Sequence, residues 1–242
     1  MNVSGSFERQ LAEWGLGLSV EAKKVLASYA QLLSRYEKAN VIGTRDFGEI
    51  LHRHILDSLS CLLFSPLQEA KKVGDVGSGG GLPGIPLAVA LPDAEITLFE
   101  ATGKKAAFLR YAAEELGLTN LRVVDARVEE AAREDDHRGA YEVCTARALA
   151  RLSVIAEYSL PLLRRGGNVV AMKGRVAADE RAEGERAVGK VGGRVSDEIE
   201  VHYLPGLEQG ERRLVLLEKL EETPDAYPRR TGMPARNPLG AK

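Results

Sequence analysis

The amino-acid sequence predicts an α/β fold with a mostly parallel sheet of seven strands, and three observations lead to this prediction. From Lys71 onward, short apolar segments alternate with segments of helical periodicity, which is the pattern of strands joined by crossover helices. The first apolar segment ends in a glycine-rich turn that leads into a helix-like stretch. The last two strand-like segments alternate polar and apolar residues without a helix between them, so we expect an antiparallel hairpin at the sheet edge.

The composition limits the class of protein. A chain of 242 residues with 44% hydrophobic residues can form one α/β domain with an appendage. The formal net charge of −2 restricts any nucleic-acid site to a local patch. Two cysteines and four histidines show neither a disulfide framework nor metal-ligand spacing. The sequence has no apolar leader segment and no apolar run of membrane length. We therefore expect a cytoplasmic protein without a metal or a membrane partner.

Helices are expected before the sheet, where residues 1–64 are predicted to form a helical segment packed on the main domain. Apolar residues recur at helical spacing within 7–39, and Ser19 is placed to cap a helix that begins just after it. Residues 43–46 are typical of a turn, and 47–64 then have the apolar spacing of a second helix. The apolar stripes of these helices are expected to pack on the sheet.

The main domain is predicted over residues 65–222. Its strands are expected at 71–77, 94–100, 121–126, 141–147, 168–174, 198–205 and 211–220. Its helices are expected at 85–91, 104–116, 127–133, 152–163 and 177–190. Pro92 and Gly117 directly follow two of these helices, and both residue types commonly end helices.

Residues 223–242 are predicted to form a basic, mobile tail. The segment holds four prolines, and its basic residues outnumber its single acid, Asp225. These basic residues are Arg229, Arg230, Arg236 and Lys242. Two interpretations stay open: a solvated terminus without function, or an arm that contacts nucleic acid.

The glycine-rich turn at 73–86, with the sequence VGDVGSGGGLPGIP, predicts a nucleotide-like ligand. Glycines adopt positive φ and let the backbone approach such a ligand at the start of the following helix. Glycines at 79, 81 and 84 satisfy G-x-G-x-x-G, which is typical of dinucleotide sites. Asp75 with glycines at 77, 79 and 81 satisfies D-x-G-x-G-x-G, the first motif of S-adenosylmethionine (SAM) methyltransferases.

The acid and two prolines favour SAM over a dinucleotide. Asp75 stands two residues before the first glycine, and the amino-acid end of SAM carries an ammonium group for an acid to satisfy. Pro83 and Pro86 crowd the helix start, where a pyrophosphate needs free N–H donors. A purely structural glycine turn is the remaining alternative.

Two further acids extend this predicted site. Glu100 ends the second strand, where a carboxylate can accept hydrogen bonds from both ribose hydroxyls of an adenosyl group. Asp125 ends the third strand, which borders the same crevice in a doubly wound sheet, so adenine is expected near residues 125–129. A helix cap is nearly as good an interpretation of Asp125.

Basic residues end the next two strands. Arg147 ends the fourth strand, and Lys173 and Arg175 end the fifth. Cations at this edge, on a chain of net charge −2, favour an anionic second substrate; ordinary surface residues are the alternative. The TARA sequence after the fourth strand lacks the [ND]-P-P-[YF] motif of exocyclic-amine methyltransferases. Cys144 lies inside that strand and is expected in the core rather than as a nucleophile.

Four segments resemble the GidB (RsmG) family of bacterial small-subunit ribosomal RNA methyltransferases. They are DVGSGGGLPGIPLA, FEATGKKAAFLR, TARALARL and, before the sheet, NVIGTRDFGEILHRHILDSL. The resemblance, over roughly residues 20–220, implies a Rossmann-like SAM-dependent methyltransferase fold. It also implies an enzyme that methylates N7 of one guanosine, position 527 of 16S rRNA, with S-adenosylhomocysteine as product. The partner would be 16S rRNA, naked or in a small ribosomal subunit or assembly intermediate, with no obligate protein partner.

The resemblance and the motifs together define the candidate site. The predicted cofactor-binding residues are Asp75, Gly77, Ser78, Gly79, Leu82, Glu100, Ala101, Thr102, Asp125, Val128, Glu129 and Arg147. The substrate-side candidates are Arg147, Lys173 and Arg175. No general base is predicted, because guanine N7 attacks with a lone pair and loses no proton. The alternatives are an NAD-dependent oxidoreductase and a non-catalytic nucleotide- or RNA-binding module.

Overall fold

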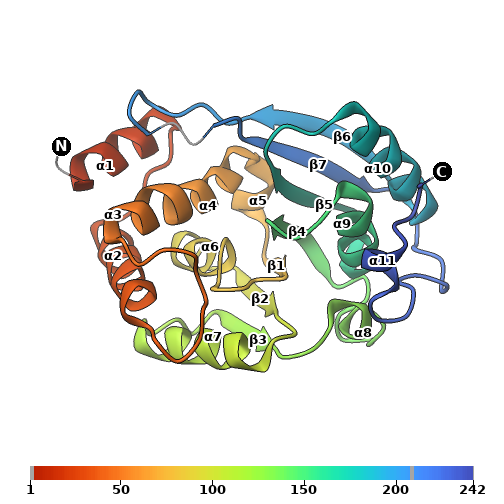
Figure 1. Ribbon diagram of the computed structural model, residues 1–242, viewed down its shortest axis with the longest axis horizontal. Coiled ribbons are helices and arrows are strands. Elements are labelled where there is room, and N and C mark those ends of the chain that lie inside the picture. Colours follow the sequence, from red (N-terminus) through yellow and green to blue (C-terminus); the bar gives the residue numbers. More distant parts are fainter. Residues whose placement is uncertain (1–2, 208–209, 242) are drawn as a thin grey trace.

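One seven-stranded sheet forms the centre of the computed structural model, which describes residues 3–207 and 210–241 (Figure 1). The strand order is β3-β2-β1-β4-β5-β7-β6. The strands are β1 (Lys72–Val76), β2 (Glu95–Phe99), β3 (Leu121–Val124), β4 (Tyr141–Arg147), β5 (Leu163–Lys173), β6 (Gly193–Glu200) and β7 (Arg213–Lys219). Strands β1 to β5 are parallel, and β7 is antiparallel to β5 and β6. The predicted fold class and C-terminal hairpin are confirmed.

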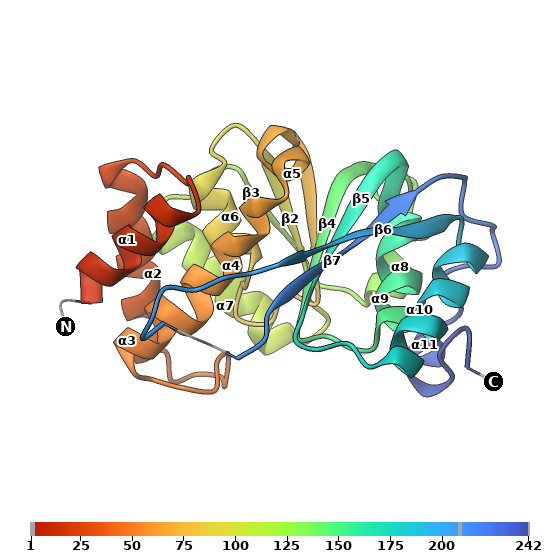
Figure 2. The same ribbon diagram turned by 90° about the horizontal axis from the view of Figure 1, so that it is seen from above.

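Helices cover both faces of this sheet (Figure 2). On one side lie α1 (Val3–Glu13), α2 (Val20–Arg35), α6 (Gly84–Ala90) and α7 (Gly103–Glu115). On the other side lie α8 (Val128–Ala131), α9 (Leu152–Ser159), α10 (Ala178–Lys190) and α11 (Met233–Arg236). Alternate strand residues face opposite sides, so Val143 packs in the α2–α6 core, whereas Cys144 packs in the α8–α10 core. Cys144 is fully buried, as expected of a core cysteine.

The N-terminal helices differ in detail from the prediction. The helix expected over 7–39 is two helices, separated by a bend in which Gly15 has a φ of +68°. The N–H of Ala22 donates to Ser19 Oγ at 3.1 Å, which confirms the predicted cap of α2.

The expected helix over 47–64 is helical but irregular. It consists of α3 (Phe47–Glu49), a π-helix η1 (Ile50–Leu56), α4 (Asp57–Leu59) and a 3₁₀-helix η2 (Ser60–Leu63). The helix α5 (Ser65–Glu69) then leads into β1, and a second 3₁₀-helix, η3 (Leu160–Leu162), follows α9. A π-helix brings in a residue out of phase with the α-helical period, and such segments are common at functional sites.

The predicted position of the sixth strand is wrong by five residues at each end, since β6 spans 193–200 rather than 198–205. Gly192, with a φ of +89°, turns the chain directly from α10 into the strand. Beyond Val201 the backbone leaves the sheet because side chains of α1 and its C-terminal turn bind it: Trp14 Nε1 donates to His202 O at 2.8 Å, and Gln10 Oε1 accepts from Leu204 N.

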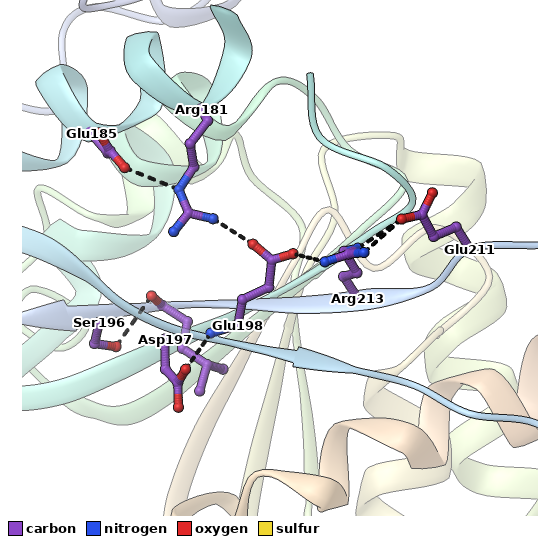
Figure 3. A network of polar contacts seen from close by, with 8 residues as sticks. Arg181, Glu185, Ser196, Asp197, Glu198, Glu211 and Arg213 are labelled. Carbon is purple, nitrogen blue, oxygen red and sulfur yellow. Dashed lines mark hydrogen bonds and ion pairs between the residues drawn. The ribbon is translucent and has the colours of Figure 1, made fainter. Parts of the chain in front are cut away.

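A chain of ion pairs ties α10 to the hairpin (Figure 3). Glu198 of β6 accepts from Arg181 of α10 and, at 2.7 Å, from Arg213 of β7. Arg213 also contacts Glu211 at 2.7 Å. These side chains are partly exposed, so the network contributes mainly to the orientation of α10 across the two strands.

The C-terminal segment 223–241 packs on the α8–α10 face, which differs from the expected mobile tail. Thr223 and Leu239 are buried, and Thr223 Oγ1 donates to Val191 O at 2.8 Å. Arg186 donates to Gly240 O at 2.9 Å. Backbone carbonyls of this segment accept hydrogen bonds from an arginine of the main domain: Arg138 donates to Tyr227 O at 3.0 Å and to Thr223 O at 2.8 Å. Lys242, part of the expected tail, lies outside the described residues.

Candidate cofactor and substrate site

A cavity of about 310 Å³ opens where β1, β2 and β4 end, on the α8–α9 side of the sheet. Its wall is formed by the glycine turn, the end of β2 with the start of α7, the start of α8, the loop after β4, α9 and α11. The lining residues are Val76, Gly77, Gly79, Phe99, Glu100, Ala101, Thr102, Lys105, Ala126, Arg127, Val128, Glu129, Ala148, Leu149, Ala150, Val154, Tyr158 and Ala235. This volume lies at the lower end of the range, about 300–1,000 Å³, typical of small-molecule sites.

The glycine turn needs its glycines for two different reasons. Gly77 has a φ of +71°, which favours glycine, and a Cβ there would meet Leu149 Cδ1 so closely that the leucine side chain would have to shift. Gly79 has a φ of +58°, and the nearest atom to a Cβ there is Gly77 O at 3.9 Å. The space beside Gly79 therefore accommodates a bound group against the bare backbone, which fits an adenosyl ligand.

The N-terminal helices hold this turn from behind. Tyr29 of α2 donates its hydroxyl proton to Gly80 O, and a Cβ on Gly80 would strike Val41 O. The turn is thus clamped between α2 with its following loop on one side and β2 on the other.

Glu100 connects the glycine turn to the start of α7. Its carboxylate accepts hydrogen bonds from Gly79 N at 2.9 Å and from Thr102 N at 2.7 Å, and the residue is buried. Each carboxylate oxygen has a second lone pair, and Glu100 lines the cavity. The predicted ribose acceptor is therefore placed where it can accept from hydroxyl groups in the cavity.

Asp75 and Ser78 lie beneath the turn and not in the cavity wall. Asp75 is fully buried and accepts from Thr145 Oγ1 at 2.8 Å and from Gly84 N at 3.2 Å. Burial raises the pKa of Asp75 to about 6. Ser78 is buried and donates to Asp75 O. Leu82 packs with the α2–α6 core. These three residues shape the turn from its α6 side.

The α8 side of the cavity combines apolar and acidic groups. Val128 and Glu129 line it as predicted, whereas Asp125 is exposed, pairs with Arg110 at 3.4 Å, and stands outside the wall. Glu129 is buried and accepts from Gly232 N at 2.8 Å. Burial and then the nearby Glu129 carboxylate raise the pKa of Tyr158 to about 12.

Arg147 lies in an internal ion-pair network beside the cavity. Its Nε contacts Asp57 Oδ2 at 3.0 Å, and its terminal nitrogens bind His54 Nδ1 at 3.0 Å and Arg53 O at 3.2 Å. Asp57 also contacts Arg212 and accepts from the Tyr203 hydroxyl at 2.9 Å. Burial, then Arg147, lowers the pKa of His54 to about 4, so this ring is neutral at pH 7. Arg147 thereby connects the end of β4 to the π-helix.

The other two substrate-side candidates differ from each other. Lys173 pairs with Glu180 at 2.7 Å and donates to Ala150 O at 3.0 Å, so it supports the loop after β4. Arg175 is exposed on the segment after β5. Both lie outside the cavity wall.

The decisive comparison is with protein families. A family model described as GidB, rRNA small subunit methyltransferase G, matches residues 22–215. The chain belongs to this family. Membership removes the NAD-dependent oxidoreductase that the glycine spacing left open.

Relatives of the GidB family resemble the chain over nearly its whole length. The ribosomal RNA small subunit methyltransferase G of Rubrobacter xylanophilus is 55% identical over 97% of the chain and 90% of that protein. The protein of the same name from Chloroflexus aggregans is 43% identical over 98% of the chain and 100% of that protein.

Solved structures with low sequence identity to this GidB-family chain provide a comparison of the fold alone. The O-methyltransferase TomG from Streptomyces achromogenes, in complex with SAM, matches with a TM-score of 0.55 at 17% identity and covers 91% of the chain and 100% of TomG. Cofactor-bound Rv0187 from MTB matches with a TM-score of 0.56 at 18% identity and covers 82% of the chain and 91% of that protein. The sheet of this GidB-family chain therefore has the methyltransferase topology.

Several residues of the site were not predicted from the sequence. Asp57 carried a signal, since a lone acid on the apolar side of the helix RHILDSL needs a buried partner. Tyr158 and Ala235 carried none, because they reach the cavity only through packing. Ala148, at the cavity mouth, is the one non-glycine residue with a positive φ (+49°) in the described ranges. Such strain concentrates at functional sites.

Two further findings concern metals and membranes. Within residues 3–207 and 210–241, no three His, Cys, Asp or Glu side chains are grouped so that they could hold a metal ion. In the same part of the chain, no helix has both the length and the apolar character needed to cross a membrane.

Proposed function

We propose that the chain transfers the methyl group of SAM to N7 of a guanosine in small-subunit ribosomal RNA, at position 527 of 16S rRNA by family resemblance. The observation that carries this proposal is the position of Glu100, which touches the glycine turn and lines a cavity of adenosyl size. Family membership supplies the class of RNA.

The residues around the cavity suit the parts of SAM, which when bound would supply an activated methyl group on a sulfonium. Glu100 would accept from the ribose hydroxyls. Leu149, Val154 and Val128 offer an apolar surface to the adenine ring. Gly77 and Gly79 let the backbone contact the ligand closely.

The chain contributes positioning rather than proton transfer. Guanine N7 presents its lone pair outward, and the reaction there needs no base. The geometry that matters is the approach of N7 in line with the methyl–sulfur bond. Arg147 and Lys173 hold the two ends of the loop 148–150 at the cavity mouth, through the π-helix and through Ala150 O. This loop therefore forms a fixed border where the substrate base enters.

The RNA must present its guanosine outside a stacked helix to reach a cavity of this size. We propose a cytoplasmic enzyme that acts on 16S rRNA, naked or within the small subunit or an assembly intermediate. Two exposed basic side chains, Arg175 and Arg53, which pairs with Glu49 at 3.1 Å, are candidates for contact with RNA phosphates.

The test is transfer of label from methyl-tritiated SAM to small subunits isolated from cells that lack this protein, with naked 16S rRNA in parallel. The product is mapped by cleavage at N7-methylguanosine followed by reverse transcription. We expect label at one guanosine, and the preferred substrate identifies the assembly state. Tight SAM binding without label on either substrate would contradict the proposed reaction and leave a binding module.

A further inference from the structure

The C-terminal strap, defined as residues 223–241, lies outside the range 22–215 that the family model matches, yet it reaches the cavity. Its helix α11 packs against α9 (Figure 1), and Ala235 of this helix lines the cavity. The strap therefore supplies a residue of the cavity wall from outside the range that the family model matches.

A second contact joins the strap to a predicted adenine-side residue. Gly232 N donates to Glu129 Oε1 at 2.8 Å, and Glu129 is 4% exposed. Gly232 has a φ of +79°, a conformation that turns its N–H toward α8 and that glycine adopts without strain. Next to it, Thr231 Oγ1 donates to Glu130 Oε1 at 2.9 Å. Both acids at the start of α8 are thus bound by the strap.

The strap is anchored by an ion pair with a buried acid. The Glu157 side chain on α9 is 0% exposed. In the described part of the chain, all of its hydrogen bonds come from Arg229: the backbone N–H at 2.8 Å, Nε at 2.9 Å and a terminal nitrogen at 2.7 Å. A buried carboxylate without a partner is costly, so Glu157 binds the strap at this register. Arg229 also donates to Asn237 O across α11.

We infer that the C-terminal strap completes the adenine side of the cofactor cavity, and that Arg229 is a positioning residue that holds Ala235 and Glu129 in the geometry that binds the adenosyl group. This inference rests on the proposed SAM site. It assigns to the basic tail a role in the cofactor site instead of a contact with RNA.

The first experiment measures binding of S-adenosylhomocysteine to the full-length protein by calorimetry. Binding of S-adenosylhomocysteine by the wild type tests the proposed site itself, and a wild type that does not bind it would contradict the proposed function. If the wild type binds, Arg229→Ala is expected to raise the Kd for S-adenosylhomocysteine at least tenfold, because the strap loses its anchor to α9. Arg230→Ala is the matched control, since Arg230 is the exposed neighbour, and its Kd should stay within twofold of the wild type. Arg229→Lys should restore part of the affinity.

A second pair of variants tests the wall without disturbing the anchor. Ala235→Trp places an indole at the cavity from an exposed helix, whereas Arg236→Trp adds the same group one residue further along. We expect Ala235→Trp to raise Kd for S-adenosylhomocysteine and KM for SAM at least tenfold, with kcat at saturating SAM within twofold. Arg236→Trp should leave the Kd for S-adenosylhomocysteine unchanged.

A third experiment measures whether binding of S-adenosylhomocysteine protects the strap from proteolysis. If the ligand binds the ordered strap, it must also stabilise that order. Saturating S-adenosylhomocysteine should therefore slow tryptic cleavage after Arg230 at least fivefold. Wild-type affinity in both Arg229→Ala and Ala235→Trp, or cleavage that the ligand does not change, would overturn the inference while the proposed SAM site still stands.

Discussion

At the scale of single residues, the two acids predicted for the cofactor site, Asp75 from the glycine motif and Glu100 from the end of the second strand, have different surroundings because strand residues alternate between faces. Asp75 shares the face of Val73, which packs in the α2–α6 core, whereas Val76 faces the α8–α9 side where the cavity lies. Glu100 follows its strand and reaches the cavity. The sequence could therefore predict both acids near the glycine turn, but not which of them lines the cavity, because that depends on the face that the cavity occupies.

Asp75 should make stability depend on pH. Its pKa is about 6 in the folded state and ordinarily 3.8. Between these pH values the folded state binds more protons than the unfolded state. The stability that neutral Asp75 gives the folded state is therefore fully present below about pH 4 and is lost as pH rises through about 6. Compared with Asp75→Asn, the wild type should lose about 3 kcal/mol of unfolding free energy over this window. Urea unfolding at several pH values checks this, and parallel profiles for the two proteins would refute it.

Glu100→Gln should weaken cofactor binding. The amide NH₂ of glutamine would face one of the two backbone N–H groups that the carboxylate now accepts, from Gly79 or Thr102. We expect Kd for S-adenosylhomocysteine to rise at least tenfold, about 1.4 kcal/mol. Glu95→Gln, an exposed acid at the opposite end of β2, is the control. An unaltered Kd in Glu100→Gln would mean that the ribose is held by another group.

At the scale of elements, the sequence predicted the sheet well because the period-two and helical patterns are local and are bounded by glycine and proline. It could not predict the π-helix η1, because that irregularity depends on distant partners. Asp57, the residue that follows η1, contacts Arg147 from β4 and Arg212 and Tyr203 from the segment before β7. The early end of β6 has the same kind of cause, since Gln10 and Trp14 bind the backbone that would have continued the strand.

Asp57→Asn should destabilise the fold because it removes the counter-charge of Arg147, whose side chain is 14% exposed. Loss of one partner from a buried pair typically costs about 3–5 kcal/mol. Urea unfolding measures it, and Glu37→Gln, which breaks a solvent-exposed pair with Arg45, should change stability by less than about 1 kcal/mol. Equal effects of the two substitutions would show that the Asp57 network is not structural.

At the scale of the whole molecule, the N-terminal helices and the C-terminal strap complete the domain at two ends of the same site. Tyr29 of α2 binds Gly80 of the glycine turn, and Ala235 of the strap lines the cavity next to which that turn lies. The sequence predicted the packing of residues 1–64 from their apolar stripes, because a helix with one face to bury leaves a periodic pattern of apolar residues. The strap lacked such a pattern: its contacts are arginine side chains with carbonyls and acids, which leave no periodic signal.

A fragment that starts at residue 65 should fail to fold independently. Without α2 and the helices over 47–63, the apolar side of α6, with Ile85 and Leu87, would face water. We expect the fragment to lack a cooperative urea transition and to have weak near-ultraviolet circular dichroism, whereas the full chain has both. A sharp transition from the fragment would establish residues 65–242 as an autonomous domain.

The position of Asp57 also has a consequence for synthesis on the ribosome. Its partners are residues 147, 203 and 212, and β7, which follows directly, occupies the place between β5 and β6. Because translation starts at the N-terminus, Asp57 is synthesised early, whereas Arg212, its last ionic partner, is added only after six-sevenths of the polypeptide has been made. A nascent chain can therefore form local helices and the β1–β4 pairing, but it cannot bury this acid with all its partners until translation is nearly complete. Truncated products of interrupted translation should consequently be recognised and degraded as unfolded chains, even when the strands β1 to β5 have been made.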